Sequence, residues 1–277
     1  MGSSISSLLF QPPPCTFLHP TRHIWLHPTP TTKIPAFHIT NGNDITVLFS
    51  HGNAEDLGMI YDWFVEFSKV LSVDVFCYDY TGYGKSTGPK PSEENVYRDV
   101  LCAYRHLTEV KGVHHTRIVL YGRSLGSGPS CYMAEKASVD SLPVAGVILQ
   151  SPLLSAYRVA FPFRFTLWGD KFPSVTRMKR ITSPVFVIHG TQDEVVPFWH
   201  GETLWSTTLP AWRAKPFWVL GAGHNNIEAH LRASGSFVDH IAEFLDIHVP
   251  MRTGGKGGRD VVSCVERAIR ETTQVEG

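Results

Sequence analysis

A serine stands between two glycines in the stretch "YGRSLGSGP", and this spacing has a clear chemical meaning. Ser124 lies two residues after Gly122 and two before Gly126, and the apolar run "RIVLY" ends at Tyr121, directly before Gly122. G-x-S-x-G at a strand-to-helix turn is the pattern of a nucleophile elbow, which exposes a serine hydroxyl in a strained backbone conformation. The glycines remove side chains that would clash in such a turn. The pattern therefore predicts nucleophilic chemistry at Ser124.

A serine hydroxyl needs a base to take its proton, so an acid and then a histidine are expected further along the chain. The loop "GTQDEVVP" supplies Asp193 and the loop "GAGHNN" supplies His224, and each follows an apolar run. Glu194 is the alternative acid. His189 and His51 are the alternative bases, but each directly precedes a glycine, where a structural hydrogen bond to a neighbouring loop is expected.

Acyl transfer to a serine also needs backbone N–H donors for the developing oxyanion. Leu125, the residue after the serine, is one expected donor. The other is expected in the loop "SHGNAEDLG", where the N–H of Asn53 is the first choice and that of Ala54 the alternative. A second glycine-rich loop, "YDYTGYGKSTG", lacks the spacing of a P-loop, so no nucleotide site is expected there.

Short apolar runs must position all of these residues. The runs are nearly continuous in apolar residues, which is typical of strands buried on both faces and hence of a parallel sheet. Helical patterns lie between them, so the sequence predicts an α/β fold with a doubly wound, mostly parallel sheet and helices on both faces. The predicted strands are 45–52, 73–80, 117–122, 144–152, 183–190 and 214–224, and the predicted helices are 58–71, 92–110 and 233–248.

Composition excludes several classes of protein. The 25 Lys and Arg residues balance 25 Asp and Glu residues, which argues against a nucleic-acid-binding protein. The five cysteines are irregularly spaced and the 14 histidines form no metal-binding motif, so we expect neither a disulfide framework nor a metal. No G-x-G-x-x-G follows the first predicted strand, and no cofactor is expected. The apolar runs are shorter than the roughly 18 residues that span a bilayer.

Three regions differ in composition. Residues 1–40 are rich in proline and are predicted to form an N-terminal anchor and an extended arm. Residues 41–249 carry the strand and helix patterns and are predicted to form one catalytic domain. Residues 250–277 are predicted to be a flexible C-terminal tail, because Pro250 is followed there by the glycine-rich stretch "MRTGGKGGRD".

The amino terminus suggests a lipid anchor. Gly2 and Ser6 match the M-G-x-x-x-[ST] pattern of N-myristoylation. One myristoyl chain binds a membrane only marginally, so a second signal is expected, and Cys15 is the candidate for palmitoylation. We hypothesise that Gly2 and Cys15 are both acylated and hold the protein at a membrane surface.

A short segment between "SPLL" and "SPVFVIHG" is predicted to form a small cap over the sheet. It contains closely spaced aromatic residues that could line a groove for a fatty acyl chain, with ordinary core packing beneath the cap as the alternative. These groove candidates are Phe161, Phe163, Phe165 and Trp168.

At these motifs the chain from about residue 45 to 245 resembles the α/β-hydrolase fold. More narrowly, it resembles the membrane-tethered serine hydrolases called α/β-hydrolase domain-containing protein 17, with their Bem46-like relatives. The motifs that carry the resemblance are "SHGNAEDLG", "YDYTGYGKSTG", "YGRSLGSGP", "SPLLSA", "VFVIHGTQDEVVP" and "GAGHNN".

The resemblance implies a catalytic triad of Ser124, His224 and Asp193 that acts through an acyl-enzyme. It also implies that the substrates are S-acylated membrane proteins, from which palmitoyl thioesters are cleaved. The expected setting is the cytoplasmic face of the plasma or endosomal membrane, with the protein as a monomer. The chain departs from animal members of the group, because it offers Gly2 and only Cys15 where those members have a cysteine-rich cluster.

Two other functions remain open at this point. The same triad serves lipases and carboxylesterases that act on glycerolipid esters. A catalytically inactive hydrolase fold that binds partners is the alternative from a different class, although the three catalytic residue types are all present.

Overall fold

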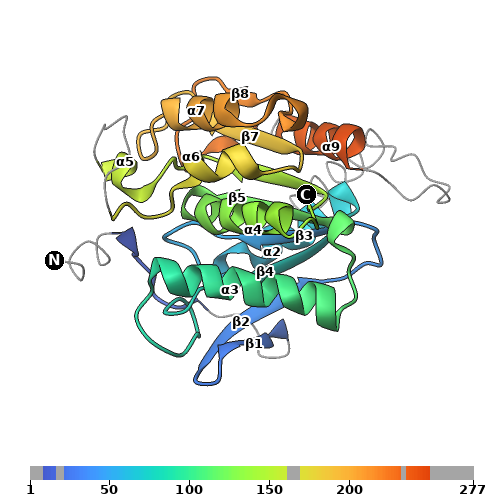
Figure 1. Cartoon of the computed structure of the whole chain (residues 1–277), viewed down its shortest axis with the longest axis vertical. Coiled ribbons are helices and arrows are strands. Elements are labelled where there is room, and N and C mark those ends of the chain that lie inside the picture. Colours follow the sequence, from blue (N-terminus) through green and yellow to red (C-terminus); the bar gives the residue numbers. More distant parts are fainter. Residues whose placement is uncertain (1–8, 17–21, 161–168, 232–234, 250–277) are drawn as a thin grey trace, which may run out of the picture.

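A single eight-stranded sheet forms the centre of the molecule in a computed structural model, which describes residues 9–16, 22–160, 169–231 and 235–249. The strand order is β1-β2-β4-β3-β5-β6-β7-β8 (Figure 1). The strands are β1 (Ile24–Thr29), β2 (Thr32–Ile39), β3 (Thr46–Ser50), β4 (Asp74–Tyr78), β5 (Ile118–Arg123), β6 (Gly146–Gln150), β7 (Val185–Gly190) and β8 (Phe217–Val219).

The sheet is parallel from β4 to β8, and β1 and β2 add an antiparallel edge. All six predicted strands are present, each within its predicted range or one residue beyond it. The residues of β3, β4, β5 and β6 are buried almost throughout, as expected for strands covered on both faces. The prediction of a doubly wound, mostly parallel α/β sheet is therefore confirmed.

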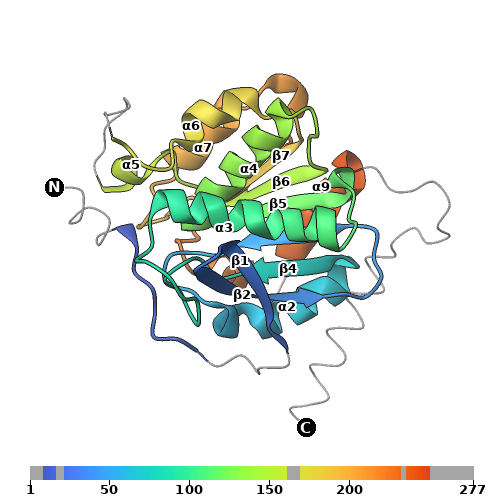
Figure 2. The same cartoon turned by 60° about the horizontal axis from the view of Figure 1, so that its bottom comes forward.

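Helices cover both faces of this sheet (Figures 1 and 2). The helices α3 and α4 lie on one face with α5 and α6, the short cap helices, and α2 and α9 lie on the other. The helices are α2 (Leu57–Leu71), α3 (Glu93–Arg105), α4 (Ser127–Val139), α5 (Ala156–Ala160), α6 (Ser174–Arg177), α7 (Trp199–Thr207), α8 (Ile227–Leu231) and α9 (Ser236–His248).

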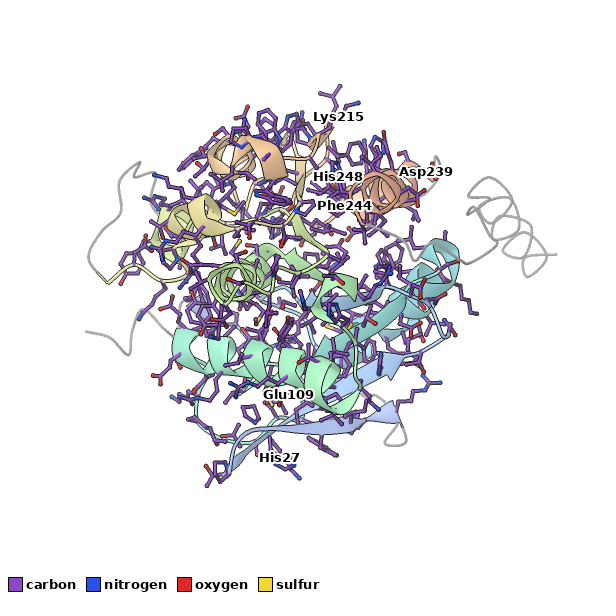
Figure 3. All side chains as sticks on the ribbon, turned by 45° about the vertical axis from the view of Figure 1, so that its right-hand side comes forward. His27, Glu109, Lys215, Asp239, Phe244 and His248 are labelled. Carbon is purple, nitrogen blue, oxygen red and sulfur yellow. The ribbon has the colours of Figure 1, made fainter. Side chains whose placement is uncertain are left out.

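The helix α9 illustrates how the second face is sealed. Phe244 is buried and its ring stacks on Phe186 of β7, with the ring centroids 5.2 Å apart. Figure 3 shows Phe244 on the side of α9 that faces the sheet, whereas Asp239 lies on the outer side. A buried aromatic side chain of this kind contributes roughly 2–3 kcal/mol of apolar transfer free energy, so α9 is held by packing rather than by helix propensity.

The expected domain boundary at residue 40 is wrong, because residues 24–39 belong to the sheet. The strand β2 pairs with β4, and its residues Ile34, Ala36 and Phe37 are buried. The prolines of this region favour extended chain, and extended chain is also what a strand requires. Pro28 lies where the register of the edge strand β1 shifts, a position that tolerates a missing N–H donor. The proline-rich arm therefore ends before Ile24.

A buried carboxyl group ties the second glycine-rich loop to α3. Asp99 is fully buried and accepts hydrogen bonds from the Thr81 N–H at 2.7 Å and from the Thr81 hydroxyl at 2.8 Å. Burial raises the pKa of Asp99 to about 7, and the bonds from Thr81 only partly oppose this effect. The folded protein therefore holds a proton on Asp99 at pH values where the unfolded chain has lost it.

This proton makes stability depend on pH. Because the pKa of Asp99 is higher in the folded state, the free energy of unfolding falls as the pH rises from about 4 to 7, by on the order of 2–4 kcal/mol. An Asp99→Asn variant stays neutral and can keep both bonds to Thr81, so it is expected to lose this pH dependence. Urea unfolding at pH 5 and pH 8 measures the difference. The exposed-site variant Asp62→Asn is the control and should behave like the wild type.

Candidate active site

The predicted elbow has the backbone strain that its motif requires. Ser124 follows β5 directly and has a φ of 51°, in the left-handed region that non-glycine residues rarely adopt. The turn at Ser124–Gly126 then leads into α4. Strain of this kind persists only when the surrounding structure enforces it, and it is often found at functional sites.

The two motif glycines allow the elbow to pack tightly. A Cβ atom at Gly126 would overlap the backbone oxygen of Ser50 at the end of β3. A Cβ atom at Gly122 would overlap the backbone oxygen of Gly126 and crowd the Ser130 hydroxyl, at 2.6 Å. The elbow is thus pressed against the end of the neighbouring strand, and only glycine fits at both positions.

Three side chains that are far apart in the sequence meet at this elbow. The Ser124 hydroxyl oxygen lies 3.0 Å from His224 Nε2. On the other side of the imidazole, His224 Nδ1 lies 2.8 Å from Asp193 Oδ2 and 3.0 Å from Oδ1. Asp193 and His224 are both nearly buried, at 8% and 9% exposure. They come from the loops after β7 and β8, so the carboxyl edge of the sheet brings together a nucleophile, a base and an acid in one line.

Asp193 is fixed by more than the histidine it orients. Its Oδ1 accepts bonds from the N–H groups of Val195 and Val196, at 3.0 and 2.7 Å. His189 Nε2 lies 2.9 Å from the Val196 carbonyl and 3.2 Å from Asp193 Oδ2. Burial opposes ionisation of Asp193, but hydrogen bonds from His189 and His224 outweigh it and hold the pKa of Asp193 well below its ordinary range. The acid therefore stays a carboxylate at neutral pH.

The alternative acid and bases have structural contacts instead. Glu194 accepts a bond from the backbone N–H of His224, at 3.2 Å, so it supports the histidine loop. His51 is fully buried, with Nδ1 2.7 Å from the Gly52 carbonyl, and burial lowers the pKa of its imidazole. His189 bonds to Val196 as described above. None of these three side chains is hydrogen-bonded to the Ser124 hydroxyl.

The two predicted oxyanion donors come from the elbow itself and from the loop after β3. Leu125 is the residue after the nucleophile and is buried. Asn53 lies in the loop after β3, and its side-chain oxygen accepts a bond from the Tyr83 hydroxyl at 2.6 Å. Ala54, the alternative donor, is exposed. The side-chain bond fixes the position of Asn53, but the oxyanion role of the two backbone N–H groups stays a prediction.

Comparisons with known proteins agree with this geometry. A family model described as the alpha/beta hydrolase fold matches residues 45–176. Alpha/beta hydrolase domain-containing protein 17C of Xenopus tropicalis is 41% identical over 210 residues, which cover 76% of this chain and 64% of that protein. This chain has the α/β-hydrolase fold. The protein of the same name in Homo sapiens is 42% identical over 206 residues, which cover 74% of this chain and 59% of that protein.

The α/β-hydrolase fold and the similarity to the protein 17 group confirm the resemblance that the motifs indicate. The matched region spans less than two thirds of the length of these curated relatives.

Solved structures agree on the fold. The Pyrococcus furiosus esterase Pf2001 superposes with a TM-score of 0.68 at 17% identity, covering 87% of this chain and 100% of the esterase chain. Est1E of Butyrivibrio proteoclasticus superposes with a TM-score of 0.63 at 17% identity, covering 82% of this chain and 99% of the Est1E chain.

The N-terminal arm of this chain contacts the loop that carries Asn53, which the sequence did not reveal. The backbone N–H of Gln11 donates to the Asn53 side-chain oxygen at 2.9 Å. The backbone N–H of Thr16 donates to Asp56 Oδ2 at 2.6 Å, and the Thr16 hydroxyl bonds to the same carboxylate. Asp56 also caps the first turn of α2. Residues 9–16 are therefore attached at both ends to the carboxyl edge of the sheet.

The hydrophobic part of the arm packs nearby. Phe10 is 5% exposed and its ring contacts that of Phe172 edge-on, with the centroids 6.0 Å apart. Cys15, the proposed palmitoylation site, is an exposed free thiol on the docked arm. Gly2, the groove candidates at 161–168 and the C-terminal tail at 250–277 lie outside the described residues.

Two cavities lie apart from the elbow motif. One of about 420 Å³ is bounded by the cap helices and α7, with Leu154, Arg158, Val175, Trp199, Glu202 and Thr203 in its wall. The other, of about 620 Å³, opens at the amino-terminal edge of the sheet, opposite the serine.

Within the described ranges, no three His, Cys, Asp or Glu side chains are grouped as a metal site requires. The same residues include no helix with the length and apolar character that crossing a bilayer requires.

Proposed function

We propose that this α/β hydrolase is a serine hydrolase that removes palmitoyl groups from cysteines of membrane-associated proteins. The observation that carries the proposal of hydrolysis is the hydrogen-bonded line from Ser124 through His224 to Asp193, built on a strained elbow. The thioester substrate is supported by the similarity to the protein 17 group. It is also supported by an exposed thiol on an arm that is docked at the same edge as the serine.

The geometry supports a two-step acyl transfer. His224 Nε2 takes the Ser124 proton as the hydroxyl attacks the thioester carbonyl, and Asp193 stabilises the imidazolium that forms. The N–H groups of Asn53 and Leu125 hold the oxyanion. The substrate's cysteine leaves as a thiolate, which needs little protonation because the pKa of a thiol is about 8.5. A water molecule activated by His224 then releases the fatty acid from the serine.

A comparison of two substrates tests this proposal. Purified wild-type protein would be given a palmitoylated peptide and, separately, a monoacylglycerol, and release of fatty acid would be measured. A kcat/KM at least tenfold higher for the thioester peptide supports depalmitoylation. A preference for the glycerolipid would support the lipase alternative. No turnover of either substrate, together with no labelling of Ser124 by a fluorophosphonate probe, would support the inactive binding protein.

The same proposal places the protein at a membrane surface through lipids on Gly2 and Cys15. Because one acyl chain gives only marginal binding, about 10⁴ M⁻¹, each site is expected to be necessary for stable attachment. A Gly2→Ala variant should therefore move from the membrane fraction of cells to the soluble fraction, and Cys15→Ser should do so in part. The buried-thiol site Cys77 offers the control variant Cys77→Ser, which removes no lipid site. An unchanged distribution of Gly2→Ala would remove the anchor from the proposal.

A further inference from the structure

The residue immediately before the nucleophile connects three loops of the active site. Arg123 reaches Glu55 in the loop after β3 and Glu228 on α8, while its own backbone leads into the elbow. We propose that Arg123 is a positioning residue for acyl transfer. It holds the nucleophile at a fixed position relative to the loop that carries Asn53, the oxyanion loop, and the loop that carries His224, the histidine loop. This inference rests on the proposed hydrolase function and concerns the placement of its parts.

Arg123 makes a forked contact with Glu55. Its Nε donates to Glu55 Oε2 at 3.2 Å, and its Nη2 donates to Glu55 Oε1. A guanidinium that binds both oxygens of a carboxylate fixes the orientation as well as the distance of its partner. The two side chains are about one-fifth exposed, so solvent screens this pair less than an ion pair on the open surface.

Glu55 connects Arg123 to the backbone of the oxyanion loop. Its Oε2 accepts a bond from the Gly52 N–H at 2.7 Å, and Gly52 directly precedes the expected donor Asn53. A Cβ atom at Gly52 would lie 3.0 Å from the same oxygen, so the carboxylate is packed directly against the loop backbone. Burial opposes the charge on Glu55, but Arg123 outweighs it and lowers the pKa of the carboxyl group. Glu55 is thus a fixed acceptor for the loop.

Glu228 connects Arg123 to the helix that follows the histidine loop. Arg123 Nη1 donates to Glu228 Oε1 at 2.9 Å, and Gln150 Nε2, at the end of β6, donates to the same oxygen at 2.8 Å. Glu228 lies on α8, which begins three residues after His224. The loop between β8 and α8 is therefore tied both to the elbow and to the central sheet.

The arrangement explains why one side chain can affect catalysis without touching the substrate. The oxyanion donors, the nucleophile and the base come from three separate loops, and loops move relative to one another unless they are cross-linked. A misplacement of about 1 Å at a reacting group can cost roughly 100-fold in rate. Removing Arg123 would leave Glu55 and Glu228 without their common cation, and their mutual repulsion would separate the loops that they hold.

The test removes the side chain and returns its functional group from solution. Arg123→Ala is expected to lower kcat on p-nitrophenyl butyrate by about 10- to 100-fold, with KM changed much less. Guanidinium chloride, far below denaturing concentrations, should restore part of the lost kcat, whereas urea, which is similar in shape but uncharged, should not. The matched control is Arg177→Ala, because Arg177 forms a comparably buried pair with Glu135 and contacts none of the three loops. This control should keep its kcat.

Each outcome decides the inference. A kcat of Arg123→Ala within twofold of wild type overturns it, as does an equal loss in Arg177→Ala or a loss that guanidinium fails to reverse. If Arg123→Ala does not fold, Glu55→Gln replaces it, since that variant keeps the shape but removes the charge. A lower kcat with little change in KM then supports the inference, and an unchanged kcat overturns it. A wild-type protein inactive toward both the ester and a fluorophosphonate would instead overturn the proposed function, and the inference with it.

Discussion

Replacing Ser124 with alanine is expected to lower kcat on acyl esters by roughly 10⁵- to 10⁶-fold while leaving the protein folded. The substitution removes the only hydroxyl within hydrogen-bond distance of His224 Nε2 in the described part of the chain. Loss of a serine nucleophile alone costs about as much as loss of a whole triad, because the three residues act as one unit. The remaining His224–Asp193 pair keeps both of its short contacts and has no group left to activate.

Folding should survive because the Ser124 side chain has no structural partner besides the histidine among the contacts described above. Its backbone oxygen accepts a bond from the Ser127 hydroxyl at 2.6 Å, and alanine keeps that oxygen. Alanine and serine also have the same Cβ atom, so the strain at a φ of 51° is unchanged. The midpoint of thermal unfolding is therefore expected to stay within about 2–4 °C of wild type, the shift that a change of about 1 kcal/mol produces in a chain of this size.

The chain offers a close control for this variant. Ser151 lies just after the neighbouring strand β6 and also has a positive φ, of 45°. Its buried hydroxyl has no hydrogen-bond partner among the residues that the structure describes. Ser151→Ala should keep full ester hydrolysis and full labelling by a fluorophosphonate, and Ser124→Ala should lose both. Labelling that persists in Ser124→Ala would show that another residue is the nucleophile, and the elbow would then lose its proposed role.

The sequence predicts the positions of these catalytic groups because the relevant physics is local. A glycine on each side of Ser124 specifies a strained turn, and continuous apolar runs specify strands whose carboxyl ends share one edge of the sheet. The choice between Asp193 and Glu194 is different. Both side chains lie in the same loop, and only the folded backbone turns Glu194 toward the N–H of His224 and leaves Asp193 facing the imidazole.

Contacts between distant segments account for what the sequence did not reveal. Arg123 is 68 residues from Glu55 and 105 from Glu228, so no local pattern predicts their cluster. The hairpin of β1 and β2 was missed for another reason. Its prolines indicate extended chain, and the difference between an extended arm and an edge hairpin depends on pairing with β4. The burial of Ile34 and Phe37 follows from that pairing.

Replacing Asp193 with asparagine is expected to lower kcat by about 10⁴-fold through the proton of His224 rather than through lost contacts. Oδ1 of Asp193 accepts bonds from two backbone N–H groups, those of Val195 and Val196, so the oxygen of the asparagine amide must take that place. The amide NH₂ then replaces Oδ2, which lies 2.8 Å from His224 Nδ1. Because an NH₂ group only donates here, His224 must accept at Nδ1 and carry its proton on Nε2.

That tautomer cannot act as the base, because the nitrogen that faces Ser124 is already protonated. The new amide also meets a second donor. The carbonyl of Val196 can only accept, so His189 Nε2 must carry a proton, and this N–H also faces the position of Oδ2 at 3.2 Å. Two donors in contact leave a buried polar group without a partner, which is expected to lower the free energy of unfolding by about 1–3 kcal/mol.

The loss of stability should depend on pH with a definite sign. The pKa of Asp193 is held below its ordinary value in the folded protein, so its charge stabilises the fold above about pH 4, the pKa of an unfolded aspartate. This contribution is lost as the pH falls further. The difference in unfolding free energy between wild type and Asp193→Asn should therefore be largest near pH 7 and should shrink below about pH 4, which urea unfolding can measure.

The neighbouring acid provides the decisive comparison. Glu194 accepts the N–H of His224 through one side-chain oxygen, and glutamine at the same position keeps such an oxygen. Glu194→Gln is therefore expected to retain kcat within a few fold, whereas Asp193→Asn loses about 10⁴-fold. In ¹⁵N NMR spectra, the ring proton of His224 should move from Nδ1 to Nε2 only in Asp193→Asn. If the two variants exchanged these behaviours, Glu194 would be the acid, and the short contacts of Asp193 would serve only to hold the loop.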